Sequence, residues 1–580
     1  MRLQYYKISG HQIVYQMKVV SKRRAPEETR KIPSVILAGR YQSFPLIDMA
    51  THANESGVAD VKVYSHIQPR EELHGTDYLN EFQALEGLVE PDLLERMKKD
   101  RFSPTLARAL LGKPDYFGFS VYSEDVLRSS RMVDMVRELV PGVKIFVGGP
   151  AAILSPLHML VHTGADYIYP GEADFSFAEA LDACENLPDE ERRERLRELG
   201  FYFIEAGRFY RPDRPDVPRI SEEKLQKVRL DYYGVIGDWG MFTDSKRRKP
   251  SIEINTSRGC GFMCPYCSKT GGDVHRAWSA DRIMDEIGNI HSSQESGFLP
   301  PHISILTFTD DDFYQKRRRS LDFLGKFRDH QIYPKEYTLL TMGSPASFYT
   351  TGSFDEQLLK AIKEVPKIEI AFGAEHLSEQ GLKDLGQPHS LAQIKEIMDR
   401  FTEAGIDQMY FLILANHETT PRTLFELGKN LLEIAADPEK NSKIRFTITP
   451  YEKIYPGTRF EESAKREGFY EEGVVDSRQV ITGIRPPLNV YQVLHLEPQD
   501  PVANAVMKDV KPALPDYWKS QQLEIIPLVL LESLKEYSER AIQDQTGDNT
   551  YRQELAQIIE EIDQLKPVTE QLKPLWIRKK

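Results

Sequence analysis

Short apolar runs alternate with segments of helix length in two long stretches of this 580-residue chain, and this alternation restricts the fold more than any other feature. Strands and helices that alternate in this way indicate a parallel sheet covered by helices on both faces. We therefore predict a doubly wound, flavodoxin-like α/β domain over residues 33–185, with ligands beyond the carboxyl ends of its strands. Its candidate strands are Ser34–Ala38, Asp60–Tyr64, Tyr116–Val121, Lys144–Val147 and Tyr167–Tyr169.

The alternation returns at Ser251 and runs to about residue 460. Six βα units predict an open, partial (β/α)6 barrel over residues 251–460, and the active site of a barrel lies at the carboxyl ends of its strands. The six candidate strands are Ile252–Thr256, Ile303–Phe308, Tyr337–Thr341, Ile368–Gly373, Met409–Ala415 and Ile444–Thr449.

The remaining segments fit neither pattern. Residues 1–32 are an N-terminal extension, and residues 186–250 are predicted to be a connector with a charged helix, a small hairpin and a proline-spaced run. Residues 461–580 are predicted to form a mostly helical C-terminal domain, because Leu523–Tyr537 and Tyr551–Leu565 have amphipathic spacing.

Composition excludes several classes of protein. The net charge of −13 argues against a dedicated nucleic-acid binder. The first residues lack the apolar segment of a signal peptide, and no window approaches the roughly 20 apolar residues that span a bilayer. With only four cysteines, a reducing cytoplasm is the expected compartment.

Three of these cysteines lie within eight positions, in the segment NTSRGCGFMCPYCSKTGG. Cys260, Cys264 and Cys267 directly follow the first strand of the predicted barrel, where such folds place their chemistry. Three thiolates in one short loop can converge on one metal centre. The C-x3-C-x2-C spacing favours an iron–sulfur cubane with three protein ligands and one iron left open, because ferredoxin clusters use four cysteines at other spacings.

A zinc site is the alternative. Structural zinc takes four ligands, usually as two separated pairs. It would therefore need His275 or a residue outside the loop as its fourth ligand. A disulfide conflicts with the reducing compartment.

The cysteine motif, placed after a strand that opens a partial barrel, resembles the radical S-adenosylmethionine (radical SAM) superfamily. The layout of residues 33–460 resembles the branch of that superfamily with an N-terminal cobalamin-binding domain. Four more segments carry the resemblance: VGGPAAILSPLHMLVHTGADYIYPGEADFSF is similar to the end of the cobalamin domain, FTDDDF to the acidic motif after the second barrel strand, AFGAEHLSEQGLKDLG to the G-x-E segment, and YPGTRFEESAKREG to the sixth-strand ending.

The resemblance implies a set of cofactors and partners. These are one oxygen-sensitive 4Fe-4S cluster, S-adenosylmethionine (SAM) chelated at its open iron, and cobalamin as methylcobalamin. Reductive cleavage of SAM would yield a 5′-deoxyadenosyl radical that takes hydrogen from an unreactive carbon. A low-potential electron donor such as flavodoxin or ferredoxin is implied, as is a small-molecule, lipid or peptide substrate.

The resemblance also assigns roles to single residues. The three cysteines would bind the cluster. Tyr266 matches the aromatic position beside adenine, Asp310 and Asp311 match positions near the SAM amino group, and Glu375 matches the position that holds the ribose hydroxyls. Asn416 is a candidate on its placement after the fifth strand alone. The structural alternatives are a packed ring, a helix cap and a salt bridge.

For the cobalamin domain, the candidates lie after the third, fourth and fifth strands. Glycines there let the backbone approach a ligand closely, although turn geometry alone can also require them. The D-x-H-x-x-G motif, which supplies an axial histidine in many cobalamin proteins, is absent after the first strand. We therefore predict that no histidine of this chain lies below the cobalt, and the missing motif leaves open that the domain has lost cobalamin. The candidates are Ser120, Val121, Gly148, Gly149, Gly171 and Glu172.

These features rank the functions that the chain could have. A methyltransferase that acts on an unactivated carbon comes first, and a cobalamin-dependent oxidoreductase that forms or rearranges a ring shares the whole layout. A zinc-stabilised binding module without enzymatic activity would not need the acidic and G-x-E segments. A methylthiotransferase is rejected, because it would need three N-terminal cysteines and only Cys184 lies outside the motif.

Overall fold

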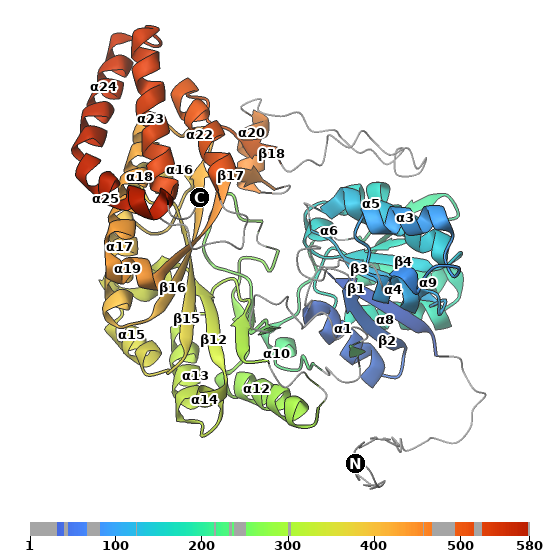
Figure 1. The fold of residues 1–580 in the computed structure, drawn as a ribbon. Coiled ribbons are helices and arrows are strands. Elements are labelled where there is room, and N and C mark those ends of the chain that lie inside the picture. The colour runs from blue at the N-terminus through green and yellow to red at the C-terminus, as the bar shows by residue number, and fades with distance from the viewer. Residues whose placement is uncertain are drawn as a thin grey trace.

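The computed structural model contains two α/β domains side by side and a layer of C-terminal helices beyond one end of the second (Figure 1). The predicted fold class is confirmed: the structure has a flavodoxin-like parallel sheet, a second, open parallel sheet and C-terminal helices. The structure describes residues 32–39, 44–65, 82–122, 125–213, 216–230, 235–236, 251–268, 270–297, 299, 303–455, 458–466, 494–514 and 525–577.

The first domain is built on a seven-stranded sheet of order β2-β1-β3-β4-β5-β6-β7. Its first five strands are parallel, and the order 2-1-3-4-5 is that of flavodoxin-like sheets. The strands are β1 (Ser34–Gly39), β2 (Asp60–Ser65), β3 (Tyr116–Ser120), β4 (Lys144–Gly148), β5 (Tyr167–Ile168), β6 (Tyr202–Glu205) and β7 (Arg208–Tyr210).

Helices cover both faces of this sheet. Val35 and Leu37 of β1 belong to the same core cluster as the inner faces of α1 and α8, whereas Ile36 and Ala38 belong to a second cluster with α3, α4, α5 and α7. A strand that is buried on both faces is apolar throughout, which explains the continuous apolar runs. The helices are α1 (Phe44–Glu55), α3 (Pro91–Lys99), α4 (Pro104–Leu110), α5 (Val126–Leu139), α6 (Pro150–Leu154), α7 (Pro156–Thr163), α8 (Ser176–Asn186) and α9 (Asp189–Leu199).

The first sheet continues beyond residue 185, where we expected the connector to begin. The hairpin expected inside the connector forms β6 and β7, and β6 pairs antiparallel with β5. Phe203 is buried, and its ring lies 5.9 Å from that of Tyr167. The hairpin thus covers the edge of the short strand β5, which would otherwise leave its backbone groups unpaired.

The second domain contains a sheet of order β18-β17-β16-β15-β12-β11-β8. The six strands from β8 to β17 are parallel and follow chain order, as predicted, and among the described strands β8 pairs only with β11, so the barrel is open. The strands are β8 (Ser251–Ile254), β11 (Ile305–Phe308), β12 (Thr338–Gly343), β15 (Ile368–Glu375), β16 (Asp407–Ala415), β17 (Ile444–Ile454) and the antiparallel β18 (Leu494–Leu496).

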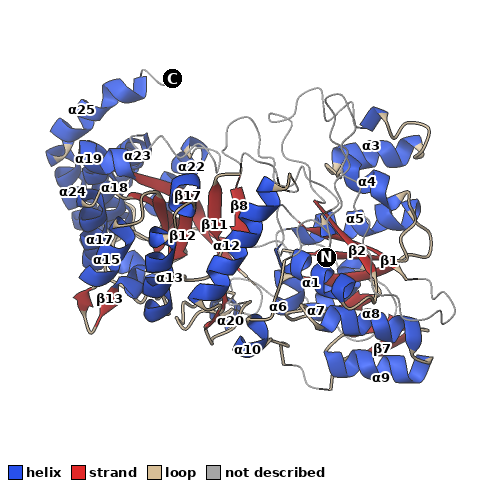
Figure 2. Ribbon diagram, turned by 90° about the horizontal axis from the view of Figure 1, so that it is seen from below, coloured by secondary structure: helices blue, strands red, loops and turns tan. Residues whose placement is uncertain are grey.

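The long helices of this domain pack on one face of the sheet. Tyr410 of β16 is fully buried on that face, where it stacks on Phe372, which in turn meets Phe401 of α17. Met342 and Phe411 remain partly exposed on the opposite face. Figure 2 shows α15, α17 and α18 on one side of the sheet and the first domain beyond the other side. The helices are α12 (Ala280–Glu295), α13 (Arg317–Asp329), α14 (Tyr333–Glu336), α15 (Glu356–Lys363), α16 (Glu379–Asp384), α17 (Leu391–Glu403), α18 (Pro421–Ala436), α19 (Pro438–Lys443) and α20 (Arg459–Arg466).

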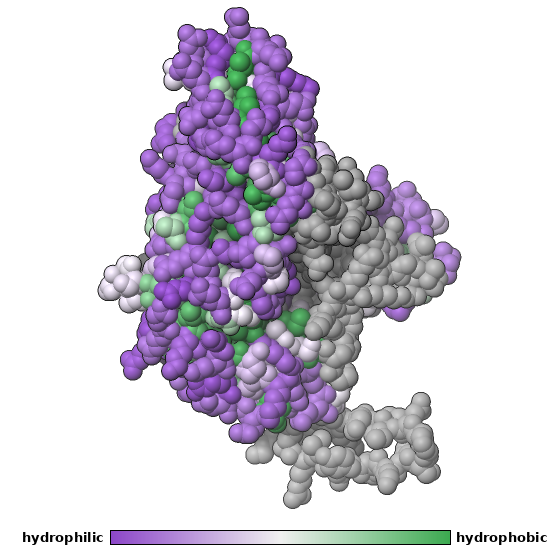
Figure 3. Space-filling view, turned by 60° about the vertical axis from the view of Figure 1, so that its left-hand side comes forward, coloured by the Kyte–Doolittle hydropathy of each residue, from purple (hydrophilic) through white to green (hydrophobic). Residues whose placement is uncertain are grey.

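The C-terminal helices extend this helical layer. Gly428 of α18 permits their close approach, because a Cβ there would lie 2.5 Å from Leu530 Cδ2. The face seen in Figure 3 is mostly hydrophilic, with narrow apolar strips between helices. None of the described helices combines the length and apolarity of a membrane span. The helices are α22 (Pro501–Ala513), α23 (Ile525–Gln543), α24 (Asn549–Gln564) and α25 (Lys566–Ile577).

Candidate active site

A short ladder closes the cysteine loop at its base. The strand β9 (Ser257–Arg258) pairs antiparallel with β10 (Arg276–Ala277), so the loop leaves and returns at one point beyond β8. The amide of Cys260 donates to the Gly272 carbonyl at 3.0 Å. Gly259 has a φ of +84°, and a Cβ there would lie 2.4 Å from the Val274 carbonyl oxygen. Only glycine therefore fits at the closing point.

The three cysteines differ in exposure. Cys260 and Cys264 are partly buried, and Cys267 is exposed. The amide of Cys267 donates to the Cys264 carbonyl at 3.2 Å, which holds the second and third cysteines in one turn. Burial raises the pKa of the Cys260 thiol to about 12. A metal that takes the Cys260 thiolate must therefore displace a proton.

Gln315 supports the first cysteine from outside the loop. Its side-chain nitrogen lies 3.9 Å from Cys260 Sγ, and its Oε1 accepts the Gly261 N–H at 3.1 Å. A side-chain amide in this place orients the thiol, as outer partners do around metal ligands.

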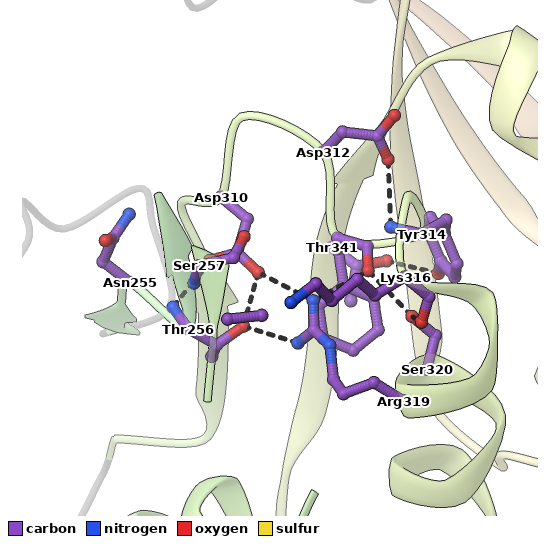
Figure 4. Close-up of polar contacts among 12 residues, drawn as sticks. Asn255, Thr256, Ser257, Asp310, Asp312, Tyr314, Lys316, Arg319, Ser320 and Thr341 are labelled. Atoms are coloured by element: carbon purple, nitrogen blue, oxygen red, sulfur yellow. Dashed lines mark hydrogen bonds and ion pairs between the residues drawn. The ribbon is translucent and has the colours of Figure 1, made fainter. Parts of the chain in front are cut away.

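Asp310 braces the base of the loop. Its side chain is almost fully buried, and its carboxylate accepts the backbone amides of Thr256 and Ser257 at 2.6 and 2.8 Å. Arg319 lies 3.8 Å from the same carboxylate and donates to the Thr256 hydroxyl at 2.9 Å. Figure 4 shows these side chains converging from the end of β8, the turn after β11 and α13. The Asp310 oxygens are thus already occupied by the protein.

The next two aspartates differ from Asp310 and from each other. Asp312 is fully buried and accepts the Tyr314 amide at 2.9 Å and the Ser347 hydroxyl at 2.5 Å, and burial raises its pKa to about 6. Asp311 is exposed, and one of its oxygens accepts the Gly259 N–H at 3.0 Å. Among the three aspartates, Asp311 is the one that can meet the ammonium group of a ligand.

Tyr266 joins the cysteine loop to the end of β15. Its hydroxyl accepts a hydrogen bond from the Gln387 amide at 2.9 Å, and its ring packs against Ile454 and Phe460. Glu375, the last residue of β15, has a φ of +65°. Non-glycine residues in this conformation cluster at functional sites. Burial raises the pKa of Glu375 to about 7, and its hydrogen bond with Tyr266 opposes the rise.

Asn416, the residue after β16, and Glu452, near the end of β17, lie close together at the ends of these neighbouring strands. The Asn416 side-chain oxygen accepts the Glu418 amide at 3.0 Å and the Thr419 hydroxyl at 3.1 Å. Glu452 is fully buried, and neither of its carboxylate oxygens has a hydrogen-bond partner in the described part of the chain. Burial raises the pKa of Glu452 to about 8; the Asn416 amide opposes this rise, and the Glu418 and Glu375 carboxylates add to it.

Replacing Glu452 with glutamine should stabilise the protein relative to the wild type as the pH increases. The folded-state pKa of about 8 lies far above the usual glutamate value, so the folded state keeps a proton that the unfolded chain loses. The wild-type stability contributed by this proton is complete below about pH 4 and is lost as the pH rises to about 8. The variant's relative free energy of unfolding should gain about 4 kcal/mol between pH 5 and pH 8.

Thermal or denaturant unfolding at both pH values measures this gain. Glu439→Gln, at an exposed position of α19, is the matched control variant. Equal effects of Glu452→Gln at pH 5 and pH 8 would contradict the assignment of a neutral Glu452.

In the first domain, Gly148 ends β4, at the carboxyl ends of the parallel strands. The turn beside it is fixed by the fold itself, because the Val121 amide donates to the Gly148 carbonyl at 2.9 Å. Gly149 has a φ of +90°, and a Cβ there would lie 2.4 Å from Ser120 Oγ. For a Cβ on Gly148, in contrast, the nearest atom among the described residues would be the Tyr169 carbonyl oxygen, at 3.7 Å. Gly148, unlike Gly149, therefore leaves room for a ligand to approach its backbone.

Gly171 and Glu172 are engaged within the protein. A Cβ on Gly171 would lie 2.6 Å from the Pro218 carbonyl oxygen. The Glu172 carboxylate accepts two hydrogen bonds from Arg276 at 2.7 and 2.8 Å and one from the Ile220 amide at 2.9 Å. Glu172 thus connects the first domain to the base of the cysteine loop.

The spacing of the three thiolates along one loop suits an iron–sulfur cluster. Within the described residues, no three His, Cys, Asp or Glu side chains lie close enough to share one metal ion. His275, the residue that a zinc site would need, has its Nε2 at 3.1 Å from the Asp312 carbonyl oxygen, and its buried Nδ1 has no hydrogen-bond partner among the described residues. A cluster distributes its ligands over several metal atoms, so three spaced thiolates suit it.

Comparison with known proteins gives one family match. Residues 254–427 match the model of the radical SAM superfamily. The chain is 25% identical over 359 residues to the uncharacterized methyltransferase PH0819 of Pyrococcus horikoshii. The aligned region covers 60% of this chain and 69% of that protein. It is 20% identical over 351 residues to the anaerobic magnesium-protoporphyrin IX monomethyl ester cyclase of Rubrivivax gelatinosus, covering 59% of this chain and 58% of the cyclase.

Solved structures share the fold. The radical SAM methyltransferase TsrM from Kitasatospora setae, with cobalamin and a 4Fe-4S cluster bound, matches with a TM-score of 0.54 and 14% identity over 75% of each chain. The cobalamin-dependent SAM radical enzyme OxsB, with aqua-cobalamin bound, matches with a TM-score of 0.59 and 12% identity over 95% of this chain and 80% of OxsB. At these identities the likeness concerns the fold.

Sequence reasoning missed several residues of this site. Gln315 lies 55 positions from the cysteine that it supports, and Arg276 lies 104 positions from Glu172. A glutamine or an arginine at such a separation gives no motif. Glu452 could have been suspected, because a glutamate stands inside the otherwise mostly apolar and β-branched strand that ends at Ile454.

Proposed function

We propose that this protein, whose residues 254–427 match the radical SAM superfamily, is a cobalamin-dependent radical SAM enzyme that methylates an unactivated carbon. The observation that carries this proposal is the closed three-cysteine loop beyond β8, in a chain whose first domain has a doubly wound sheet with an open glycine at its strand ends. The substrate classes that we propose are a small molecule, a lipid or a peptide.

The cysteine loop would hold the first cofactor. We assign Cys260, Cys264 and Cys267 as ligands of one 4Fe-4S cluster, which when bound supplies the reductive cleavage of SAM. The chain's own contribution is to close the loop with the β9–β10 ladder and to hold the first thiol beside Gln315. Three ligands from the protein leave one coordination position for a small molecule.

Residues around the loop would hold SAM. The exposed Asp311 is proposed to receive the ammonium group, since a carboxylate pairs well with it. Glu375, held in a strained conformation beside Tyr266, is proposed to meet the ribose hydroxyls. Tyr266, which hydrogen-bonds to Glu375, and Asn416, the residue after β16, are proposed to face the nucleoside. Asp310 serves instead to hold the loop.

The first domain would hold cobalamin against its carboxyl strand ends. Gly148 and the partly exposed Ser120 are the ligand-facing candidates, whereas Val121, Gly149, Gly171 and Glu172 are explained by contacts inside the protein. TsrM and OxsB, which share the fold, were solved with cobalamin bound, and this supports the proposal.

Two reactions are compatible with this arrangement. PH0819 carries the name of a methyltransferase, and the Rubrivivax gelatinosus protein is named as a cyclase that forms a ring. We favour methylation because the methyltransferase matches at the higher identity and over the larger share of its own length. Ring formation is the second candidate.

Labelled SAM separates the two reactions. The anaerobically reconstituted protein is incubated with a low-potential reductant, a metabolite extract and SAM that carries a trideuterated methyl group. We expect labelled product, 5′-deoxyadenosine and S-adenosylhomocysteine in equal amounts, because one SAM makes the radical and a second remethylates cobalamin. If 5′-deoxyadenosine appears without S-adenosylhomocysteine, and a product loses hydrogen without gaining the label, ring formation is the reaction.

A further inference from the structure

Two arginines at the base of the cysteine loop reach into the first domain. Arg258 of β9 donates to both carboxylate oxygens of Asp174, at 2.7 Å for Oδ2. Arg276 of β10 donates to both oxygens of Glu172, at 2.7 and 2.8 Å. The two carboxylates belong to the segment that follows β5, at the proposed cobalamin end of the first sheet. We name these four side chains the interdomain clamp.

The interdomain clamp is buried. The exposed fractions of its side chains are 13% for Arg258, 7% for Arg276, 9% for Glu172 and 2% for Asp174. Both pairs are bidentate, so each fixes an orientation as well as a separation. A buried ion pair is by itself weak evidence for net stability, because desolvation offsets the attraction, so another role for these pairs has to be considered.

A third carboxyl group, that of Asp48, lies beside Asp174. Burial raises the pKa of Asp48 in α1 well above its usual range, and the neighbouring Asp174 charge adds to this rise. Burial opposes ionisation of Asp174 as well, but Arg258 holds the pKa of Asp174 below its ordinary value. Asp48 is therefore the neutral member, and Asp174 carries the charge that meets Arg258.

The backbone around the interdomain clamp is closely packed, so the clamp residues have little room to move. The Glu172 amide donates to the Pro218 carbonyl at 2.9 Å, and a Cβ on Gly272 would lie 2.5 Å from Arg219 Nε. Arg276 also donates to the Gly271 carbonyl at 2.7 Å, within the cysteine loop. The segment around Pro218 and Arg219 thus lies between the end of β5 and the cysteine loop and contacts both.

We propose that the interdomain clamp is a positioning device that fixes the cluster loop at one distance from the corrinoid in the first domain. This inference rests on the proposed function, because it needs both cofactors. Arg258 and Arg276 lie at the two ends of the cysteine loop. A displacement of the first domain would therefore also move the cysteines. A misplacement of about 1 Å between reacting groups can cost about 100-fold in rate, so such a device has a clear use.

The test measures the distance between the two cofactors and needs no substrate. In protein that contains the reduced cluster and cob(II)alamin, pulsed electron paramagnetic resonance gives the dipolar coupling between the two spins. The wild type should give one narrow distance. The isosteric double variant Glu172→Gln/Asp174→Asn, which removes both charges of the clamp and keeps their shape, should lose this single distance and give a broad distribution. Iron, sulfide and cobalamin contents should stay at wild-type levels.

A matched control separates this effect from a general loss of buried charge. Arg192 of α9 is similarly buried, at 17% exposed, and pairs with Glu205 and Asp189, which both belong to the first domain. Arg192→Gln should keep the narrow distance. If the double variant does not fold, Arg276→Lys decides, because it keeps the charge and loses the bidentate contact, and it should broaden the distance to a smaller extent.

Other outcomes have definite meanings. An unchanged narrow distance in the double variant or, where that does not fold, in Arg276→Lys overturns the proposal. Loss of cobalamin in Glu172→Gln but not in Arg276→Gln also overturns it, because Glu172 would then be a corrinoid-binding residue. A wild-type protein without cluster or cobalamin signals would instead refute the proposed function, which is a distinguishable failure.

Discussion

Cys264→Ala protein should lose its iron–sulfur cluster and, with it, the cleavage of SAM. The cluster has three proposed protein ligands and no fourth to replace a lost one. Changes to outer partners of metal ligands already cost 10- to 100-fold, so loss of a direct ligand should lower 5′-deoxyadenosine formation by more than about 100-fold. Iron and sulfide analysis after anaerobic reconstitution, with product quantified by mass spectrometry, measures both effects.

Cys184 supplies the control for this prediction. It lies in α8 of the first domain, and burial raises the pKa of its thiol to about 11, as expected for a cysteine that packs as a small apolar side chain. Cys184→Ala should keep the wild-type cluster and activity. A Cys264→Ala protein that retains iron and cleaves SAM would show that the loop is not the cluster site.

Gly148→Phe protein should fail to bind cobalamin while its cluster assembles normally. Among the described residues, no atom lies closer than 3.7 Å to a Cβ placed on Gly148, so we expect the free protein to tolerate a side chain that would occupy the place of the corrinoid. Overpacking a close-fitting site costs up to about 3 kcal/mol, which corresponds to about 100-fold weaker binding. Spectrophotometric titration with hydroxocobalamin measures the affinity.

Gly148→Ala is the graded control and should weaken binding much less. Gly149 is unsuitable for this test, because any side chain there meets Ser120 and Val121 and strains the domain itself. If Gly148→Phe protein binds cobalamin as the wild type does, the corrinoid does not lie at the ends of β3 and β4.

The parallel arrangement of both sheets could be predicted from the alternation of apolar runs with helix-length segments. Continuous apolar runs such as Ile145–Val147 identify strands that are buried on both faces, and the helices between them leave parallel pairing as the available solution. The extension by β6 and β7 was assigned to a connector, because pairing of a hairpin with an existing sheet edge depends on the tertiary fold and leaves no periodic signal.

Site residues that lie close together in one segment could be predicted from the sequence. The roles of residues that contact distant segments could not. The three cysteines are close in sequence, so their spacing alone indicates a shared metal centre. Asp310 was expected to meet SAM, but its carboxylate accepts backbone amides from the end of β8, more than 50 positions away. A carboxylate that holds a loop and a carboxylate that binds a ligand look the same in a sequence.

The central claim is that this chain cleaves SAM reductively and moves its methyl group through cobalamin. The most direct test counts 5′-deoxyadenosine and S-adenosylhomocysteine from the wild-type protein, reconstituted anaerobically with iron, sulfide and cobalamin and given SAM and a low-potential reductant. Both products should form, and S-adenosylhomocysteine should disappear when cobalamin is omitted. A protein with a full complement of iron and cobalamin that forms neither product would contradict the account.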